Sequence, residues 1–310
     1  TEDTLVKCRE RLSFEELLAN YIRLRKLKLL AQNTTATALK DGNNKVIDFI
    51  QSLKFNLTPA QKKAHKEILD DLDKKRPMMR MLQGDVGSGK TIVAAIACLK
   101  AISNKTQAAV MAPTELLAEQ HMESFLNWFG PLKINVIKLT GGKKKSIRKE
   151  ILSQVENGKI DLIIGTHALF QDGVVFKNLS LIVIDEQHRF GVNQRVALRK
   201  KGEALKKQPH QLIMTATPIP RTLAMAAYAD LDSSIIDMLP VGRKSIETIV
   251  VPNDKRKSVI DRVKNACING EQAYWVCPLI EESETIKADA ATDRYDHLKD
   301  TLKPLSIGLI

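Results

Sequence analysis

The segment 81–91, MLQGDVGSGKT, has the residue types and the spacing of a phosphate-binding loop. It fits the pattern G-x-x-x-x-G-K-[ST], with Gly84, Gly89, Lys90 and Thr91 at the fixed positions. Glycines allow the backbone to reach positive φ and to turn its N–H groups toward an anion. Lysine supplies positive charge for the β and γ phosphates, and the threonine hydroxyl is a ligand for Mg²⁺. The segment therefore predicts a site for a nucleotide and its magnesium ion.

The residues on either side of this loop favour the same interpretation. Residues 78–82 have the character of a short strand, and 92–102 form an apolar run of helix length, so the loop falls on a strand-to-helix turn. The helix would point its positive N-terminus at the phosphates, and the backbone of Gly87 and Ser88 would complete the cradle. The alternative is a chance match in a turn rich in glycine and serine, and the agreement of pattern and context argues against it.

A pair of acids, Asp185 and Glu186, follows the aliphatic run 179–184. In a phosphate-loop enzyme the acid directly after such a strand binds Mg²⁺, and the next acid can activate the attacking water. The structural alternative is a strand that simply ends in polar residues. Gln187 and His188 come next, where they could link the nucleotide site to a neighbouring loop.

Two further segments have a structural and a functional interpretation. Thr58 and Gln61 make a helix capping box around Pro59, which by itself accounts for Gln61. Thr215 and Thr217 place two hydroxyls in a loop of small residues, which suits a segment that changes its hydrogen bonds between states and also suits an ordinary turn. The residues alone do not choose between these alternatives.

The elements that must position these residues alternate in β–α order. Strands are predicted at 78–82, 108–111, 134–139, 161–164, 179–184 and 211–214, with helices at 92–102, from 113, at 147–155 and at 193–207. This order implies an α/β fold with a mostly parallel, doubly wound sheet, whose loops gather at the carboxyl ends of the strands. Every motif named above lies at such an end, which makes that edge the predicted active face.

Other elements flank this predicted sheet. Helices are expected at 13–32, where Ser13 and Glu16 suggest a capping box, and at 45–53. After a turn-rich linker at 239–244, strands are predicted at 246–251, 273–277 and from 307, with helices at 255–267 and 289–302. The predicted domains are N-terminal helices at 1–54, a nucleotide-binding lobe at 55–238 and the start of a second α/β lobe at 239–310.

Composition sets broad limits on function. The chain has 310 residues, 44% of them hydrophobic and 27% charged, which is typical of a globular protein long enough for two domains. Its net charge of +12 suits a polyanionic partner, although a diffuse positive surface also serves solubility. The four cysteines are far apart, which predicts neither a zinc site nor disulfides and suits the cytoplasm. No apolar run approaches the roughly 18 residues of a membrane span, so no membrane partner is expected.

The motifs together carry a family resemblance. The segments GDVGSGKT, APTELLAEQH, GTHALFQ, DEQHRFGV and TATPIPRTLA resemble the motifs of superfamily 2 helicases, most closely those of the bacterial enzymes that remodel branched DNA. The resemblance extends from RLSFEELLA to AYWVCPLIEESE and so covers nearly the whole chain. It implies RecA-like lobes and an ATP-driven translocase on double-stranded DNA, acting on stalled forks and Holliday junctions. Single-strand-binding protein is a further partner that the resemblance suggests.

The resemblance also assigns expected roles to individual residues. Gln61 belongs to the motif that recognises adenine, Lys90 and Thr91 take phosphate and Mg²⁺, Asp185 takes Mg²⁺, and Glu186 is the catalytic base. Contacts to the DNA backbone are implied for Thr114, Thr166 and His167, and coupling between the sites for Gln187, His188, Thr215 and Thr217. The lysine run 143–145 could add phosphate contacts or be a solvated loop. The basic residues of the first predicted helix could likewise contact nucleic acid or be solvated charges on its surface.

Two departures from the family pattern limit this expectation. Family members begin with a wedge-bearing domain, whereas this chain starts at Thr1 without a methionine, and no Q-x-x-G-R-x-G-R segment occurs in it. We therefore expect a piece of a longer protein that binds ATP but hydrolyses it poorly alone, because a lost arginine finger costs about 10³–10⁵ in rate. A nucleotide-binding scaffold without turnover is the alternative. A GTPase is disfavoured, since Asn44-Lys45 is followed by Val46-Ile47 and not by the N-K-x-D pattern.

Overall fold

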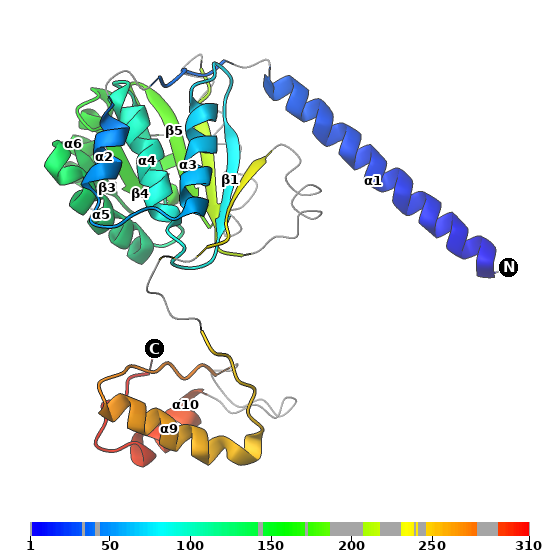
Figure 1. Ribbon diagram of the computed structural model, residues 1–310, viewed down its shortest axis with the longest axis vertical. Helices are drawn as coiled ribbons and strands as arrows, with labels where there is room; N and C mark the ends of the chain where they lie inside the picture. The colour runs from blue at the N-terminus through cyan, green and yellow to red at the C-terminus, as the bar shows by residue number, and fades with distance from the viewer. Residues whose placement is uncertain are drawn as a thin grey trace. The chain divides into compact units, whose positions relative to one another are not determined.

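A computed structural model of the chain describes residues 2–32, 35–40, 44–141, 145–170, 173–186, 207–217, 231–238, 240, 246–277 and 291–309. The chain forms two compact units, Thr1–Arg243 and Lys244–Ile310. The larger unit contains an α/β sheet with helices packed on it (Figure 1).

The sheet of the larger unit has seven strands in the order β3-β4-β2-β5-β6-β1-β7, and all of its described pairings are parallel. The strands are β1 (Met79–Gly84), β2 (Gln107–Met111), β3 (Val136–Leu139), β4 (Leu162–Gly165), β5 (Leu179–Asp185), β6 (His210–Thr215) and β7 (Asp232–Ile236). Because all strands run the same way, their carboxyl ends meet at one edge, as the sequence predicted.

Both faces of the sheet are covered, and the pleat of β2 divides its residues between them. Ala108 and Val110 pack into one hydrophobic core, while Ala109 and Met111 pack into the other. The first core includes helices α2 (Lys45–Ser52), α3 (Pro59–Leu72), α4 (Lys90–Ser103) and α5 (Glu115–Phe129); the second includes α6 (Lys145–Glu156). Figure 1 shows α2, α3 and α4 side by side over one face. Helix α4 is therefore buried on almost all sides, which explains its continuous apolar sequence.

The six strands predicted in this unit are confirmed, with ends shifted by a few residues, and so are the helices at α2, α4, α5 and α6. The fold is the doubly wound parallel sheet that the alternation predicted. The helix predicted at 193–207 lies almost entirely outside the described residues. All four cysteines are free, as expected.

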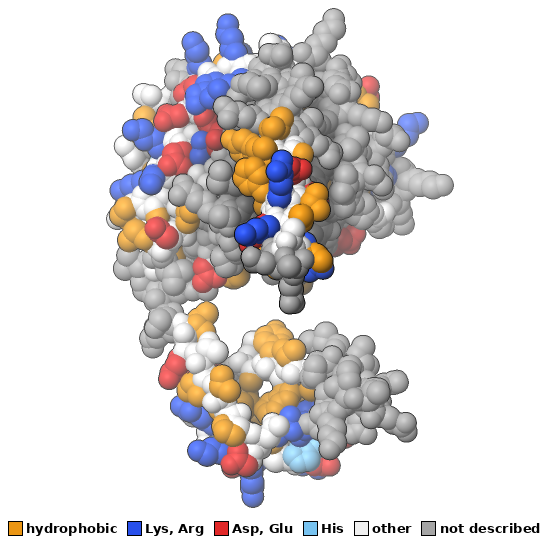
Figure 2. All heavy atoms as spheres, turned by 90° about the vertical axis from the view of Figure 1, so that its right-hand side faces the viewer, with side chains coloured by type: hydrophobic (Ala, Val, Ile, Leu, Met, Phe, Trp, Pro, Cys, Tyr) orange, Lys and Arg blue, Asp and Glu red, His pale blue; other side chains and the backbone are white. Residues whose placement is uncertain are grey.

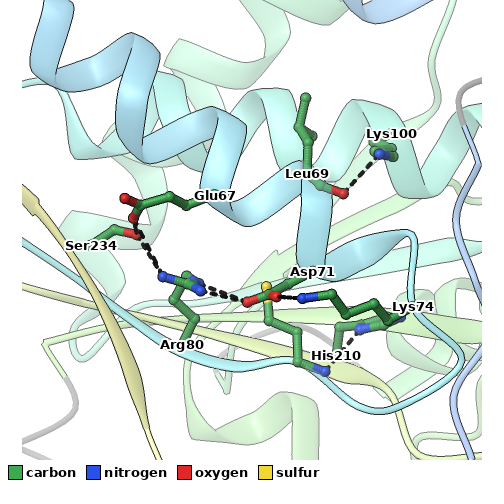
Figure 3. A network of polar contacts seen from close by, with 9 residues as sticks. Glu67, Leu69, Asp71, Lys74, Arg80, Lys100, His210 and Ser234 are labelled. Atoms are coloured by element: carbon green, nitrogen blue, oxygen red, sulfur yellow. Dashed lines mark hydrogen bonds and ion pairs between the residues drawn. The ribbon is translucent and has the colours of Figure 1, made fainter.

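Strand β7 was not predicted, because its sequence DSSII alternates poorly and only Ser234 and Ile236 are buried. Polar contacts at this edge of the sheet hold it in place (Figure 3). Arg80 of β1 donates to Ser234 Oγ at 3.0 Å and to Asp71 Oδ2 at 2.6 Å, and Ser234 Oγ also donates to Glu67 of α3. Strand β7 is thus attached to α3 directly, through Ser234 and Glu67, and also through Arg80 of the neighbouring strand.

Helix α1 (Glu2–Gln32) is longer than predicted, and the capping box expected at Ser13 was wrong, because Ser13 lies in the helix interior. The residues before it include good helix formers such as Leu, Glu and Arg, which favour continuation. Large apolar side chains of α1, Leu12, Phe14 and Leu17 among them, are exposed. Figure 2 faces the side of the larger unit on which α1 lies, and it shows orange apolar side chains beside blue basic ones there. None of the helices in the described part of the chain is both long and apolar enough to cross a bilayer.

The smaller unit contains helices α9 (Arg256–Ile268) and α10 (Ala291–Thr301), which confirm the two helices predicted there. Its buried core is formed by Ile260, Leu298 and Leu302. The strands predicted at 246–251, 273–277 and from 307 were wrong for the described residues, which have no strand pairing. A strand needs a neighbour for its backbone hydrogen bonds, and these segments have none among the described residues. Val250 and Val276 are exposed, while Trp275 and Ile307 pack against the core of the smaller unit.

Candidate nucleotide site and nucleic-acid contacts

The phosphate-loop segment connects β1 to α4, as predicted. Gly87 and Gly89 have φ values of 73° and 88°, the left-handed region that favours glycine. A Cβ on Gly89 would also lie 2.3 Å from Gln61 Nε2, so a side chain there would displace the Gln61 amide in addition to straining the backbone. The loop therefore adopts the backbone conformation that its glycines were expected to permit.

Ser88 contributes a buried hydroxyl to the loop. Its side chain is 1% exposed, and its Oγ has no hydrogen-bond partner among the described residues. Leaving such a group unpaired costs about 1–3 kcal/mol, so an unpaired donor in a phosphate loop is suited to a ligand oxygen. A Cβ on Gly84 would come within 2.5 Å of this Oγ, which explains the glycine at the start of the motif.

Lys90 lies at the first position of α4 and its ammonium turns back over the loop. Its Nζ donates to the carbonyl oxygens of Gly84 at 2.7 Å and Asp85 at 3.0 Å. Burial lowers the pKa of Lys90, while the nearby carboxylates of Glu186, Asp185 and Asp85 oppose that change. A polyphosphate would give this ammonium anionic partners in place of neutral carbonyls. Thr91, the next residue, is partly buried in the first turn of α4.

Asp185 is the last residue of β5 and is buried. Its Oδ2 lies 2.8 Å from Nε2 of His121, which is also buried and belongs to α5. His121 was not among the predicted site residues, although it ends the segment APTELLAEQH. No local signal in the sequence points to this contact, because its two partners are 64 positions apart.

Glu186 has a φ of 51°, which is unusual for a residue other than glycine. Its backbone N–H donates to the Met214 carbonyl at 2.9 Å, so the contact with β6 continues past the end of β5. Its carboxylate accepts from the backbone N–H of Ala216 at 3.0 Å and from Thr215 Oγ1 at 3.4 Å. Thr215 Oγ1 also lies 2.9 Å from Thr217 Oγ1. The structure thus brings the predicted base and the predicted coupling threonines into contact.

Gln61 links the start of α3 to the phosphate loop. The predicted capping box is present: Thr58 Oγ1 accepts from the Gln61 N–H, and Gln61 Oε1 accepts from the Thr58 N–H at 2.9 Å. Its Nε2 donates to the Ser88 carbonyl at 2.7 Å. The side chain is buried and bonded at both ends of its amide, and the contact to adenine stays a prediction.

The residues predicted to contact DNA lie along the same edge of the sheet. Thr114 is exposed and caps α5, accepting from the Leu117 N–H at 3.2 Å. Thr166 is buried directly after β4, and His167 begins a short 3₁₀ helix. Strands β2 and β4 are neighbours, so Thr114 and Thr166 follow adjacent strand ends, whereas the nucleotide motifs follow β5, β6 and β1. Gln187 and His188 lie outside the described residues, as do 143 and 144 of the lysine run.

The site has the donors that a nucleotide-bound magnesium ion requires. Within the described residues, no group of three or more His, Cys, Asp or Glu side chains could hold a metal alone. Mg²⁺ in such enzymes is held by one or two protein oxygens together with substrate phosphates and water. A hydroxyl at Thr91 and a carboxylate at Asp185, beside a loop shaped for phosphate, fit that pattern.

The comparisons with known proteins agree with this geometry. The DEAD/DEAH box helicase family matches residues 58–226. The chain is 52% identical to the ATP-dependent DNA helicase RecG of Haemophilus influenzae over 97% of its own length and 44% of that protein. The corresponding values for RecG of Escherichia coli K12 are 51%, 97% and 43%. The chain therefore spans less than half the length of these curated relatives.

Solved structures give a similar result. A structure of RecG bound to a three-way DNA junction superposes with a TM-score of 0.82 at 40% identity, covering 98% of this chain and 39% of that one. A DUF1998 helicase, MrfA, superposes with a TM-score of 0.60 at 18% identity over 84% of this chain and 41% of that one. At that identity the second match concerns the fold alone, and the first confirms the RecA-like architecture.

Proposed function

The chain belongs to the DEAD/DEAH box helicase family, and on that basis we propose that it is the motor core of an ATP-dependent DNA helicase of the RecG type. Residues 55–238 would form the first motor lobe and 239–310 the start of the second, with 1–54 as N-terminal helices. In the whole protein the motor would translocate on double-stranded DNA and remodel stalled forks and Holliday junctions in the bacterial cytoplasm, with single-strand-binding protein as a further partner.

The observation that carries this proposal is the meeting of three strand ends. Strands β5, β6 and β1 are adjacent in the sheet, and their loops supply the acids 185–186, the threonines 215 and 217, and the phosphate loop. Lys90 would bind the β and γ phosphates, Thr91 and Asp185 would hold Mg²⁺, and Glu186 would take a proton from the attacking water. The bound ion would neutralise charge on the phosphates.

The remaining residues of the site would bind and position the nucleotide. The backbone at Gly84, Gly87, Ser88 and Gly89 would cradle the phosphates, and Gln61, already bonded to this loop, would contact adenine. The Gln61 amide is held by hydrogen bonds at both ends, and groups held in place in this way reduce the reorganisation that hydrolysis requires.

Coupling to DNA would use the loops beside the nucleotide site. Thr114, Thr166 and His167 would contact the phosphate backbone, as suits hydroxyl and imidazole groups at the ends of β2 and β4. Thr215 is bonded to Glu186 and to Thr217, and both threonines would respond to the state of the nucleotide together with Gln187 and His188. The solved relative on a three-way junction supports branched DNA as the substrate.

The test is ATP hydrolysis by a protein of the relatives' full length, measured without DNA, with linear duplex and with a model fork. We expect the fork to stimulate hydrolysis strongly, Lys90→Ala to abolish that stimulation, and Lys159→Ala, at an exposed lysine ahead of β4, to preserve it. Equal ATP hydrolysis without DNA, with linear duplex and with the fork would refute the branch-directed motor and favour a nucleotide-binding scaffold.

A further inference from the structure

His121 connects two parts of the larger unit that belong to different sequence motifs, helix α5 and the end of β5. It lies on α5, the helix that Thr114 caps at the DNA-facing edge, and its ring contacts Asp185 at the end of β5. Both residues are buried, and the exposed fraction of the whole residue is 7% for His121 and 9% for Asp185. An ionised carboxylate only accepts hydrogen bonds, so Nε2 of His121 is the donor.

This hydrogen bond fixes one oxygen of the carboxylate and leaves the other for a ligand. The bond is made by Oδ2, so the Asp185 side chain is held in one rotamer at the point where β5 ends. A carboxylate that binds a metal is oriented in this way by groups that do not touch the metal. We propose that His121 is a positioning residue that sets Asp185 for Mg²⁺ and connects the DNA-contacting end of α5 to the nucleotide site, an inference that rests on the proposed function.

Helix α5 is firmly packed, which makes it suitable for this connection. Phe125 and Phe129 are fully buried with their ring centroids 5.3 Å apart, and Phe129 meets Phe49 of α2 edge-on at 5.8 Å. His121 lies seven positions after Thr114 along the helix, a rise of about 10 Å. Because a packed helix moves as a unit, a displacement of its capped end on DNA binding reaches the imidazole and therefore Asp185.

The experiment measures the binding of a fluorescent, non-hydrolysable ATP analogue to the 310-residue chain over a range of Mg²⁺ concentrations. His121→Leu removes the donor at similar volume, and His121→Gln restores an N–H at comparable reach. We expect His121→Leu to leave binding without Mg²⁺ unchanged and to raise the Mg²⁺ midpoint about tenfold, the lower end of such effects. His121→Gln should return the midpoint close to that of the unsubstituted chain.

The matched control is His210→Leu, which removes another buried histidine, at the amino ends of the strands. It should lower stability without moving the Mg²⁺ midpoint. An unchanged midpoint in His121→Leu would overturn the positioning role. Repeating the Mg²⁺ titration with duplex DNA tests whether α5 connects the DNA contact to the nucleotide site. We expect the DNA-induced change in the Mg²⁺ midpoint to be lost in His121→Leu. If that change persists, the connecting role of His121 is overturned. Failure of the proposed function would give a different result from failure of the positioning role. In that case the unsubstituted chain would not bind the ATP analogue, or Lys90→Ala would not weaken its binding.

Discussion

Glu186 occupies a left-handed backbone conformation that costs a residue with a side chain about 1–3 kcal/mol. The surrounding loop offsets this cost, because the backbone N–H of Glu186 donates to Met214 and its carboxylate accepts from Ala216 and Thr215. The carboxylate thus accepts two hydrogen bonds from the end of β6 and the loop after it. A change in that loop would change the direction in which the Glu186 carboxylate points, and this is the physical route that we propose for coupling.

Substitution of Thr215 by valine tests this route at the scale of one residue. The change removes the hydroxyl that donates to Glu186 and accepts from the Thr217 N–H at 3.2 Å, while keeping a similar shape. We expect kcat for ATP hydrolysis in the full-length protein to fall by about tenfold, less than the 10²–10⁴ for loss of a general base. Nucleotide affinity should hardly change. Weaker nucleotide binding with an unaltered kcat would show that Thr215 acts on the ground state instead.

Most residues of the proposed site were predicted from local sequence motifs. Lys90 and Thr91 belong to one short pattern, and Asp185 and Glu186 to another. His121 was missed because its partner is 64 positions away, and only the packing of α5 against the sheet brings the two together. Contacts of that kind carry no local pattern.

At the scale of elements, Gly165 controls how closely two strands approach. It ends β4, where it pairs with Leu139 of β3 and Met111 of β2. A Cβ there would lie 2.1 Å from the Leu139 carbonyl oxygen, a backbone atom that cannot turn away. We expect Gly165→Ala to lower the free energy of unfolding by at least about 1–3 kcal/mol, measured by urea denaturation.

Gly173 provides the matched control for this substitution. A Cβ at Gly173 would meet no atom within 4 Å, so Gly173→Ala should leave the urea midpoint nearly unchanged. Equal stability of the two alanine variants would contradict the close approach of β3 and β4. Because Thr166 follows Gly165, the same strand spacing also sets the position of a predicted DNA contact.

His210 attaches the segment 35–40 to the sheet at the amino ends of the strands. Its Nδ1 accepts from the Met78 N–H at 3.0 Å, so its Nε2 donates to the Thr37 carbonyl at 2.9 Å. In the same segment, the backbone N–H of Ala36 donates to the Lys75 carbonyl, just after α3. The N–H of Leu39 donates to the Leu72 carbonyl, at the end of α3. The neutral ring satisfies both partners, whereas a protonated ring would face the Met78 N–H with a second donor.

This arrangement predicts that stability depends on pH. Burial lowers the pKa of His210 below its usual value of about 6.5, despite the opposing effects of the Thr37 hydrogen bond and Asp71. At lower pH the unfolded chain then binds a proton that the folded chain does not. The contribution of His210 to the free energy of unfolding is therefore fully present above about pH 6.5 and is lost as the pH falls below that value. Burial lowers the pKa of His65 in the same direction. Urea midpoints between pH 7.5 and 5 should fall, and His210→Leu, though less stable at pH 7.5, should show a smaller fall.

At the scale of the whole molecule, the accuracy of the sequence predictions follows from strand pairing. Each strand predicted in the larger unit has a parallel neighbour, so its apolar run is buried and paired. In the smaller unit the apolar runs at 246–251 and 273–277 have no pairing partner among the described residues, and they form no strand. An apolar run shows that a segment can be a strand, but a neighbouring strand decides whether it is one.

The division into two compact units leads to a final prediction. Every contact described for the nucleotide site joins residues within Thr1–Arg243, and the smaller unit has a separate core around Ile260. A protein of residues 1–243 should therefore fold and bind the fluorescent ATP analogue with the same affinity as residues 1–310, within about twofold or 0.4 kcal/mol. Lys90→Ala in both proteins provides the control for specific binding. A much weaker affinity of residues 1–243 would mean that residues 244–310 contribute to the site, and the second unit would then have to supply a group to the nucleotide.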